Sequence, residues 1–314
     1  MAKLIEKITL GIDVAKEEGV VHHWATGDTQ VVPHQEDAID AFFHTLQAPG
    51  QIAIEPTSNY HLLWVERALA HGFEVYLVNP RQLVHYREAI NQRNKTDPAD
   101  AWLLARFLAH EAAQLRPWRP QDKQAQTLWA LIKRRARVVE ARKRLQLSLR
   151  EIRLPAQALF TQFKRLLERI DQRIMRTIEA LGWKEDYLRC RSIPGIGPVN
   201  AAALVSAWHR GVFANSEAFI AFIGMDVRMR ESGSYRGKRK LTKRGEAEIR
   251  RLLYCAAQPA CCYAPFKAYY QKQIDKGLPK IAAKVILARK LARIAFALMQ
   301  NQTTFVKKSE MGVA

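Results

Sequence analysis

Cysteine is scarce in this chain, and its spacing argues against both a structural zinc site and a disulfide-rich fold. The four cysteines among the 314 residues form no Cys-x-x-Cys pair, and no histidine cluster completes a zinc site with them. We therefore expect neither a structural zinc nor a disulfide framework, and we predict reduced core thiols in a cytoplasmic protein. The cysteines are Cys190, Cys255, Cys261 and Cys262.

Long uncharged apolar runs are also missing. The apolar stretch from Lys284 to Met299 is interrupted by Arg289, Lys290 and Arg293, so it is not expected to span a membrane. The first seven residues lack the apolar centre of a signal peptide. No membrane partner is expected.

Acidic residues are few in the second part of the chain. Residues 119–314 hold 40 Lys and Arg against 15 Asp and Glu, whereas residues 1–118 hold 10 against 15. The net charge of +20 therefore comes entirely from the second part. A basic excess that spans several elements favours a nucleic-acid partner over a membrane surface or an ordinary solvated surface.

What is present in residues 1–118 is an alternation of strand and helix signals. The predicted order, β-β-β-α-β-α-β-α, is the plan of an α/β fold of the RNase H-like (RuvC-like) type. Ligands of open α/β sheets gather at the carboxyl ends of the strands. The predicted strands are 7–14, 19–26, 29–33, 51–55 and 73–78, and the predicted helices are 37–47, 58–70, 81–91 and 97–113.

Two further domains are predicted beyond the proline-rich boundary at 116–120. Residues 119–190 are expected to form a central α-helical hairpin or coiled coil, which Pro155 divides. Residues 191–314 are expected to form a mainly α-helical domain that ends in an amphipathic helix at 278–299. The basic face of the hairpin is explained by nucleic-acid contact or, nearly as well, by a solvated coiled-coil surface.

Four carboxylates lie where a metal site can form: Asp13, Glu55, Asp97 and Asp100. The first two end short apolar runs, and the last two lie three residues apart on one face of a predicted helix start. Divalent cations such as Mg²⁺ prefer oxygen ligands, and phosphodiester chemistry uses such cations at the attacking and leaving oxygens. The set therefore predicts a divalent-metal site for phosphodiester chemistry.

Each of these carboxylates also has an ordinary explanation. Asp13 can simply end a strand, Glu55 before Pro56 can be a turn residue, and Asp97 before Pro98 can be a helix N-cap. Their joint arrangement is harder to explain in this way, because an unpaired carboxylate after a buried run is costly.

A glycine pair, Gly195 and Gly197, precedes a helix predicted at 201–208. The glycines permit a tight turn whose backbone N–H groups point outward at a helix N-terminus, which is a phosphate-binding geometry. The pattern resembles the helix-hairpin-helix motif, which grips the DNA backbone without reading sequence. A turn that needs glycine for helix packing fits the spacing equally well, and the surrounding positive charge favours phosphate contact.

The most basic stretch runs from Arg228 to Arg251, with ten Lys and Arg against three Glu. Ser232 lies in it before Gly233, in a predicted loop that is too polar to be core. Such a serine can act as an exposed nucleophile beside cations that neutralise a phosphate, although most Ser-Gly pairs in loops are turns. The residues expected to position phosphates are Arg230, Arg236, Lys238, Arg239, Lys240, Lys243 and Arg244.

Taken together and in order, these stretches resemble a known family over nearly the whole chain. The chain is similar to the insertion-sequence transposases that join an N-terminal RuvC-like DEDD domain to a C-terminal serine-bearing domain, which are bridge-RNA-guided DNA recombinases. The matching segments are Gly11-Ile12-Asp13-Val14-Ala15-Lys16, Ile54-Glu55-Pro56-Thr57, Asn94-Lys95-Thr96-Asp97-Pro98-Ala99-Asp100-Ala101, Ile193-Pro194-Gly195-Ile196-Gly197, Phe222-Ile223-Gly224-Met225, Glu231-Ser232-Gly233-Ser234 and Lys243-Arg244-Gly245.

The resemblance implies a site and a mechanism. Asp13, Glu55, Asp97 and Asp100 would bind Mg²⁺, or Mn²⁺ in its place. Ser232 would attack a DNA phosphodiester and form a covalent phosphoserine link, with Ser234 as the alternative nucleophile. Pro56, directly after Glu55, constrains that turn without removing the ligand.

The resemblance also implies partners. These are the element ends and the target DNA, and a structured guide RNA that determines most of the sequence choice. A homo-oligomer, dimer or tetramer, is expected, in which the metal site of one subunit meets the serine of another. The hairpin would support assembly and RNA binding, and the protein would act in a prokaryotic cytoplasm at the nucleoid.

Two rival hypotheses remain open from the sequence. In the first, the chain is a junction-resolving endonuclease whose metal site activates water, and the serine stretch is only structural. In the second, it is a nucleic-acid-binding protein with an inert RNase H-like domain. Only the recombinase forms a covalent protein–DNA adduct.

Overall fold

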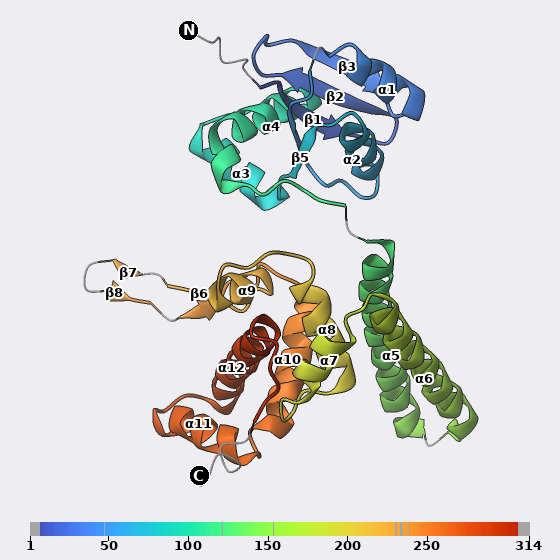
Figure 1. The fold of residues 1–314 in the computed structure, drawn as a ribbon, viewed down its shortest axis with the longest axis vertical. Coiled ribbons are helices and arrows are strands. Elements are labelled where there is room, and N and C mark those ends of the chain that lie inside the picture. Colours follow the sequence, from blue (N-terminus) through green and yellow to red (C-terminus); the bar gives the residue numbers. More distant parts are fainter. Residues whose placement is uncertain are drawn as a thin grey trace. The chain divides into compact units, whose positions relative to one another are not determined.

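The computed structural model describes residues 7–46, 48–120, 122–152, 154–229, 231–232, 235–237 and 239–306. The chain divides into two compact units, Met1–Pro120 and Gln121–Ala314, which we call the N-terminal unit and the C-terminal unit. Figure 1 draws the N-terminal unit in blue to teal and the C-terminal unit in green to red.

The N-terminal unit is built on a five-stranded sheet with the strand order β3-β2-β1-β4-β5. The pairs β1–β2 and β2–β3 are antiparallel, whereas β1–β4 and β4–β5 are parallel. Parallel neighbours need long crossovers, and helices supply them here. This mixed sheet confirms the RuvC-like α/β fold expected from the sequence. The strands are β1 (Thr9–Val14), β2 (Glu18–His23), β3 (Thr29–Pro33), β4 (Gln51–Ile54) and β5 (Glu74–Leu77).

Helices cover both faces of this sheet (Figure 1). Alternate residues of β1, such as Leu10 and Ile12, pack into one core with α1 and α2. Ala53 of β4 belongs to a second core with α3 and α4. Because successive strand residues face opposite sides, Gly11 and Asp13 lie on the α4 side. The helices are α1 (Glu36–His44), α2 (His61–Ala70), α3 (Pro80–Ala89) and α4 (Asp97–Glu111), which the short 3-10 helix η1 (Ala112–Gln114) follows.

Gly11 allows α4 to lie directly on β1. A Cβ atom at this position would overlap the carbonyl oxygen of Ala101 and the backbone nitrogen of Ala105. Close-packed interiors leave no room for such an overlap. The absence of a side chain therefore lets α4 pack against β1 through the backbone of Ala101 and Ala105.

The C-terminal unit begins with a helical hairpin, formed by α5 (Lys123–Ile152) and α6 (Gln157–Ala180). Arg135 of α5 donates two hydrogen bonds to the carboxylate of Asp171 of α6, at 2.5 and 3.0 Å. The base of the hairpin, with Leu128, Ile132 and Ile178, is buried in the same core as the helices that follow. The hairpin and those helices therefore fold around a shared core.

The remaining helices make this unit mainly α-helical, as expected. The alanine-rich helix α8 is buried almost all round, and its small side chains let its neighbours approach closely. α12 packs against α8, α9, α10 and α11. The helices are α7 (Lys184–Arg191), α8 (Pro198–Trp208), α9 (Ser216–Phe222), α10 (Ala247–Ala260), α11 (Ala264–Asp275) and α12 (Lys280–Gln300).

A β-finger, made of four short strands between residues 227 and 241, separates α9 from α10. β6 (Val227–Arg228) pairs antiparallel with β9 (Lys240–Leu241), and β7 (Glu231–Ser232) pairs antiparallel with β8 (Tyr235–Arg236). The expectation of a loop here is wrong. Backbone hydrogen bonds can form a ladder between polar segments that show no apolar alternation. Figure 1 shows the finger extending away from α9.

The cysteines differ from expectation in their burial. All four are free, and Cys190 is buried, where desolvation raises the pKa of its thiol. Cys261 is half-buried, and Cys255 and Cys262 are exposed. The prediction that the cysteines are core residues is therefore right only for Cys190, because the other positions lie on outer helix faces or at a helix end.

Candidate active site

Asp13 lies near the carboxyl end of β1, and Glu55 directly follows the neighbouring strand β4, so both lie at the same edge of the sheet. β1 and β4 are parallel and pair Ile12 with Ile54, so the residues that follow are also neighbours. Adjacent strands are about 4.8 Å apart, and the carboxyl ends of parallel strands are the usual ligand-binding edge. Strand register therefore brings these two predicted site residues together.

The first turn of α4 supplies the other two carboxylates. Thr96 is the N-cap, and its hydroxyl accepts a hydrogen bond from the backbone N–H of Ala99 at 3.4 Å. The alternative interpretation of Asp97 as the N-cap is therefore wrong. Asp97 and Asp100 lie inside the first turn, where the helix dipole favours negative charge.

The four carboxylates share one electrostatic environment. Burial, followed by the charges of Asp100, Asp97 and Glu55, raises the pKa of Asp13 to about 6. Burial, followed by the charge of Asp100, also raises the pKa of Glu55. Charges influence one another in this way only over short distances. The structure therefore brings all four predicted acidic residues into one cluster.

One member of the cluster already has a cationic partner. Arg87, in the last turn of α3, donates a hydrogen bond from Nη2 to Oδ1 of Asp100 at 2.5 Å. The side chains are 16% and 13% exposed, so the ion pair is largely shielded from water. The sequence analysis missed Arg87, because only the tertiary packing of α3 on α4 places it there.

The donor set suits a hard divalent cation. Carboxylate oxygens are the ligands that Mg²⁺ and Mn²⁺ prefer. The raised pKa of Asp13 reflects its burial first and then the neighbouring negative charges, and a bound cation would offset both. Among the described residues, no group of three His, Cys, Asp or Glu side chains converges closely enough to hold a metal ion as placed. Metal binding would therefore require these side chains to turn toward a common point.

Ser232 is exposed near the end of the β-finger. Its backbone pairs with that of Tyr235 across the β7–β8 ladder. Three predicted site residues, Arg230, Ser234 and Lys238, lie outside the described residues, as does the side chain of Arg236. The other residues predicted to position phosphates are all exposed: Arg239, Lys240, Lys243 and Arg244.

Two glycines determine how the base of the β-finger closes. Gly224 has a φ of +69°, and a Cβ atom there would overlap the backbone nitrogen of Gly245. Arg250 donates a hydrogen bond to the carbonyl oxygen of Gly245 at 2.5 Å, and the hydroxyl of Thr242 donates to the carboxylate of Asp226. This close backbone approach holds together the two segments that enter β6 and leave β9.

The glycine pair before α8 divides into two different roles. Gly195 has a φ of +91°, and a Cβ atom there would lie 2.7 Å from both the carbonyl oxygen of Ala256 and the Cβ atom of Ala260. Close packing on α10 therefore explains Gly195. Gly197 is the N-cap of α8, and the nearest atom to a Cβ there would be Nδ2 of Asn200 at 3.7 Å. Phosphate contact at this open position stays a prediction.

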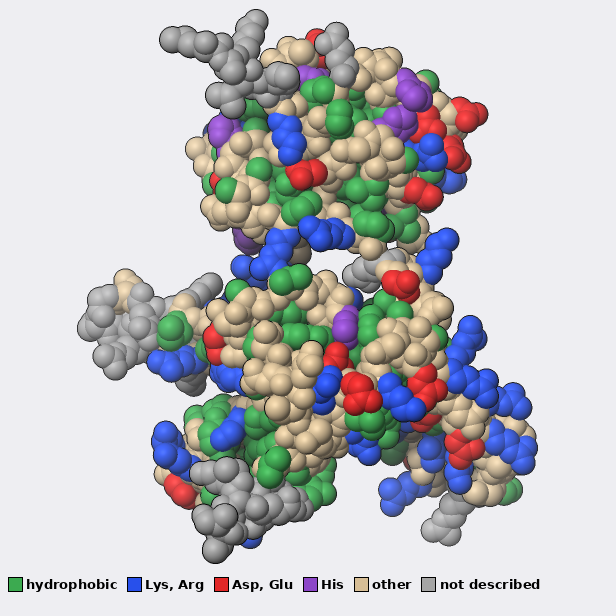
Figure 2. Space-filling view, viewed as in Figure 1, with side chains coloured by type: hydrophobic (Ala, Val, Ile, Leu, Met, Phe, Trp, Pro, Cys, Tyr) green, Lys and Arg blue, Asp and Glu red, His purple; other side chains and the backbone are tan. Residues whose placement is uncertain are grey.

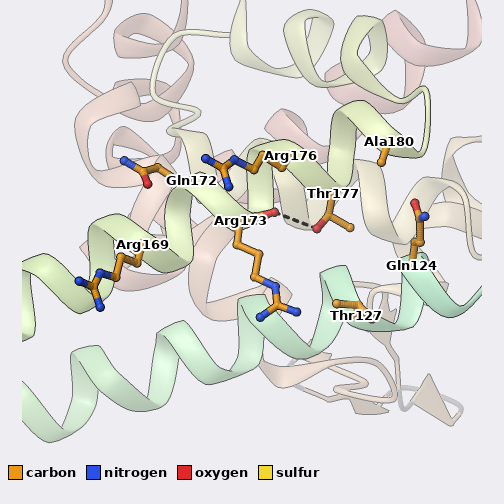
Figure 3. A pocket seen from close by; sticks show the side chains of 8 residues that line it. All are labelled: Gln124, Thr127, Arg169, Gln172, Arg173, Arg176, Thr177 and Ala180. Carbon is orange, nitrogen blue, oxygen red and sulfur yellow. Dashed lines mark hydrogen bonds between the residues drawn. The ribbon is translucent and has the colours of Figure 1, made fainter.

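A basic groove that the sequence analysis did not identify lies along the hairpin, with a volume of about 600 Å³. Arg169, Arg173 and Arg176 follow one another four and three residues apart on one face of α6, and Figure 3 shows Arg173 extending from α6 toward α5. Within the described part of the chain none of the three forms a salt bridge. Figure 2 shows Lys and Arg gathered over this hairpin. The groove is lined by Gln124, Thr127, Arg169, Gln172, Arg173, Arg176, Thr177 and Ala180.

No helix in the described ranges is both long and apolar enough to span a bilayer.

The chain is similar to several known proteins. The pilin gene-inverting protein of Moraxella lacunata is 25% identical over 328 residues, which cover 97% of this chain and 99% of that protein. The transposase for insertion sequence element IS1111A of Coxiella burnetii is 26% identical over 281 residues, which cover 77% of this chain and 76% of that protein. T. thermophilus RuvC in complex with a Holliday junction substrate aligns with 36% of this chain and 100% of its own, at a TM-score of 0.29 and 15% identity.

Two sequence families match in succession. Residues 10–152 match the DEDD transposase domain of IS110 elements, described as a transposase. Residues 188–271 match the domain described as the transposase IS116/IS110/IS902 family. The first match contains the four carboxylates, whose domain type implies a divalent metal, and the second contains the β-finger. The chain therefore belongs to the IS110 family of transposases, with an N-terminal DEDD domain and a C-terminal domain of the IS116/IS110/IS902 type.

Proposed function

We propose that this transposase cuts and rejoins DNA through a covalent phosphoserine intermediate, with a divalent metal at its carboxylate cluster and a structured RNA as guide. One observation carries the proposal. The chain combines an oxygen-only cluster, in which the pKa of Asp13 is raised, with an exposed serine on a basic β-finger. A nuclease that activates water needs the cluster but has no use for the serine.

The carboxylates would hold Mg²⁺ or Mn²⁺, which would neutralise the charge that develops on the phosphodiester oxygens. Asp13 and Glu55 are fixed by the strand register, and Asp97 and Asp100 by the packing of α4 on Gly11. These residues must be ionised to bind a cation. Because the pKa of Asp13 is raised to about 6, the bound state is favoured above that pH.

Ser232 would supply the nucleophile. Its Oγ forms a bond to phosphorus while the bond from phosphorus to one deoxyribose oxygen breaks, and the hydroxyl proton passes to that leaving oxygen. The phosphodiester energy is kept in the serine ester, so a second deoxyribose hydroxyl can displace Ser232 and restore an intact strand. Exposed cations on the finger and beside its base, Arg239 and Arg244 among them, would hold the flanking phosphates.

The partners follow from the same chemistry and from the family resemblance. Element ends and target DNA would be the substrates, and the same cutting and rejoining would also serve inversion between two sites of one DNA. The basic groove of the hairpin offers a phosphate-binding surface for the guide RNA. A dimer or tetramer would let the metal site of one subunit act with the serine of another, in the cytoplasm at the nucleoid.

A trapping experiment tests this proposal. The protein, its copurified RNA and a nicked DNA of the element end are incubated with Mg²⁺, and covalent adduct is measured on a denaturing gel. Ser232→Ala should abolish the adduct, and Ser234→Ala should retain it. Adduct retained by Ser232→Ala and lost in Ser234→Ala would move the nucleophile to Ser234. Free DNA ends without any adduct would contradict the serine mechanism and support a metal-dependent endonuclease.

A further inference from the structure

Among the described residues, Asp100 is the member of the carboxylate cluster that forms an ion pair. Its own Oδ1 accepts the hydrogen bond from Arg87 at 2.5 Å. A guanidinium therefore already neutralises one of the four carboxylates.

Arg87 also contacts the connection that leads into α4. Its Nη1 donates to the carbonyl oxygen of Asn94 at 3.5 Å, in the connection between α3 and α4. The side chains of Arg87 and Asp100 are only 16% and 13% exposed, so this ion pair is largely shielded from water.

We propose that Arg87 is a displaceable counter-ion of the metal site: it pairs with Asp100 in the metal-free protein and releases this carboxylate when a divalent cation binds. The inference rests on the metal site of the proposed function and extends it to a residue outside the four carboxylates. An oxygen that accepts from a guanidinium is less available to a metal, and the guanidinium and the metal repel each other. The ion pair and the cation therefore compete, and the ion pair lowers the apparent metal affinity.

A purely structural role for Arg87 makes the opposite prediction. If Arg87 only ties α3 to α4, its loss would loosen the first turn of α4 and weaken metal binding. If it competes with the cation, its loss would strengthen metal binding. The sign of the change in affinity therefore distinguishes the two roles.

The test is a calorimetric titration of Mn²⁺ into the full-length protein, freed of nucleic acid, without DNA or RNA present. Arg87→Gln should bind Mn²⁺ with a Kd about tenfold lower than that of the unaltered protein. Arg93→Gln is the matched control, because Arg93 is exposed on the same connection and the change in charge is the same. It should alter the affinity by less than about twofold.

A second measurement keeps the inference testable if Arg87→Gln folds poorly. Arg87→Lys keeps the charge but loses the planar fork, and should show a smaller tightening. Its melting temperature should fall without Mn²⁺ and recover with saturating Mn²⁺. Unchanged or weaker Mn²⁺ binding in both variants, while the unaltered protein binds normally, would overturn this inference alone. Mn²⁺ binding that is absent, or that survives Asp13→Asn, would overturn the metal site itself, whereas the serine is tested separately by the adduct.

Discussion

The two units hold their candidate reactive groups in opposite ways. The carboxylates of the N-terminal unit lie at the edge of a five-stranded sheet, beside the start of α4, and three of the four are half-buried while Asp97 is exposed. Ser232 of the C-terminal unit lies exposed on strands of two residues each. The two units also differ in charge. Residues 1–118 hold 15 acidic and 10 basic residues, whereas residues 119–314 hold 15 acidic and 40 basic residues.

The difference shows what each chemistry requires of a fold. A metal site needs like charges held close together, which is unfavourable and must be enforced by packing elsewhere. A serine nucleophile needs access to a long, charged substrate, which an exposed finger with nearby cations provides. We therefore expect changes around the carboxylates to affect chemistry and folding, and changes at the exposed cations near the finger to affect substrate binding.

The largest effect is expected from Asp13→Asn, which should remove cleavage and leave DNA binding intact. Losing the charge neutralisation of a bound cation should slow adduct formation by about 10³-fold or more. DNA affinity, measured by fluorescence anisotropy on the same preparation, should stay unchanged because the phosphate contacts lie in the other unit. Asp37→Asn, an exposed acid of α1, is the control. An equal loss of DNA binding would show that the two units are not separable in this way.

Gly11→Ala should selectively destabilise the N-terminal unit. The added Cβ atom has to displace the backbone of α4 at Ala101 and Ala105, and overpacking of this kind costs about 1–3 kcal/mol or more. Calorimetry should show an earlier transition for the N-terminal unit only. Gly197→Ala in the other unit meets no atom closer than 3.7 Å and should cost less than about 1 kcal/mol. Similar losses in the two variants would contradict the role of close packing at Gly11.

Removing two exposed cations near the finger should weaken nucleic-acid binding by about tenfold. In Arg239→Gln with Arg244→Gln, the slope of log affinity against log salt should become shallower by about 2, one for each lost phosphate contact. The paired control is Arg81→Gln with Arg93→Gln, two exposed arginines of the N-terminal unit. If this control lowers the salt slope as much, DNA binding is not confined to the C-terminal unit.

The smallest effect is a pH dependence of the metal-free N-terminal unit. The pKa of Asp13 is raised from 3.8 to about 6 in the folded state, so the folded state binds a proton that the unfolded state releases. This contribution to the free energy of unfolding is complete below about pH 4 and is lost as the pH rises through 6. Urea unfolding at pH 4.5 and pH 7 should show this slope, and Asp13→Asn should reduce it. An identical slope in the variant would show that Asp13 is not its source.

The secondary structure of the N-terminal unit could be predicted from the sequence because its signals are local. Short apolar segments bounded by turn signals indicated the strand at 29–33, observed as Thr29–Pro33, and the strand at 51–55, observed as Gln51–Ile54. The β-finger could not be predicted, because strands of two residues are too short to show a periodicity. The basic groove had a visible signal in the spacing of Arg169, Arg173 and Arg176, but its depth depends on how α5 lies against α6.

The sequence predicted the carboxylates of the candidate site but not the contacts that these residues make. The four carboxylates were recognisable because each follows an apolar run or begins a helix. The cap at Thr96 and the ion pair between Arg87 and Asp100 were not, since each depends on side-chain geometry rather than on residue type. The role of Gly195 could not be predicted either, because a glycine turn that packs on α10 and a glycine turn that binds phosphate have the same sequence pattern.

By itself, the sequence determined the element order of the N-terminal unit, the separation of acidic from basic residues and the family motifs, because periodicity and composition are properties of neighbouring residues. Only the tertiary structure decided that α4 lies on Gly11, that Asp13 and Asp100 influence one another, and that Arg87 neutralises Asp100. These are contacts between residues distant along the chain, and they exist only once the sheet register and the helix packing are formed.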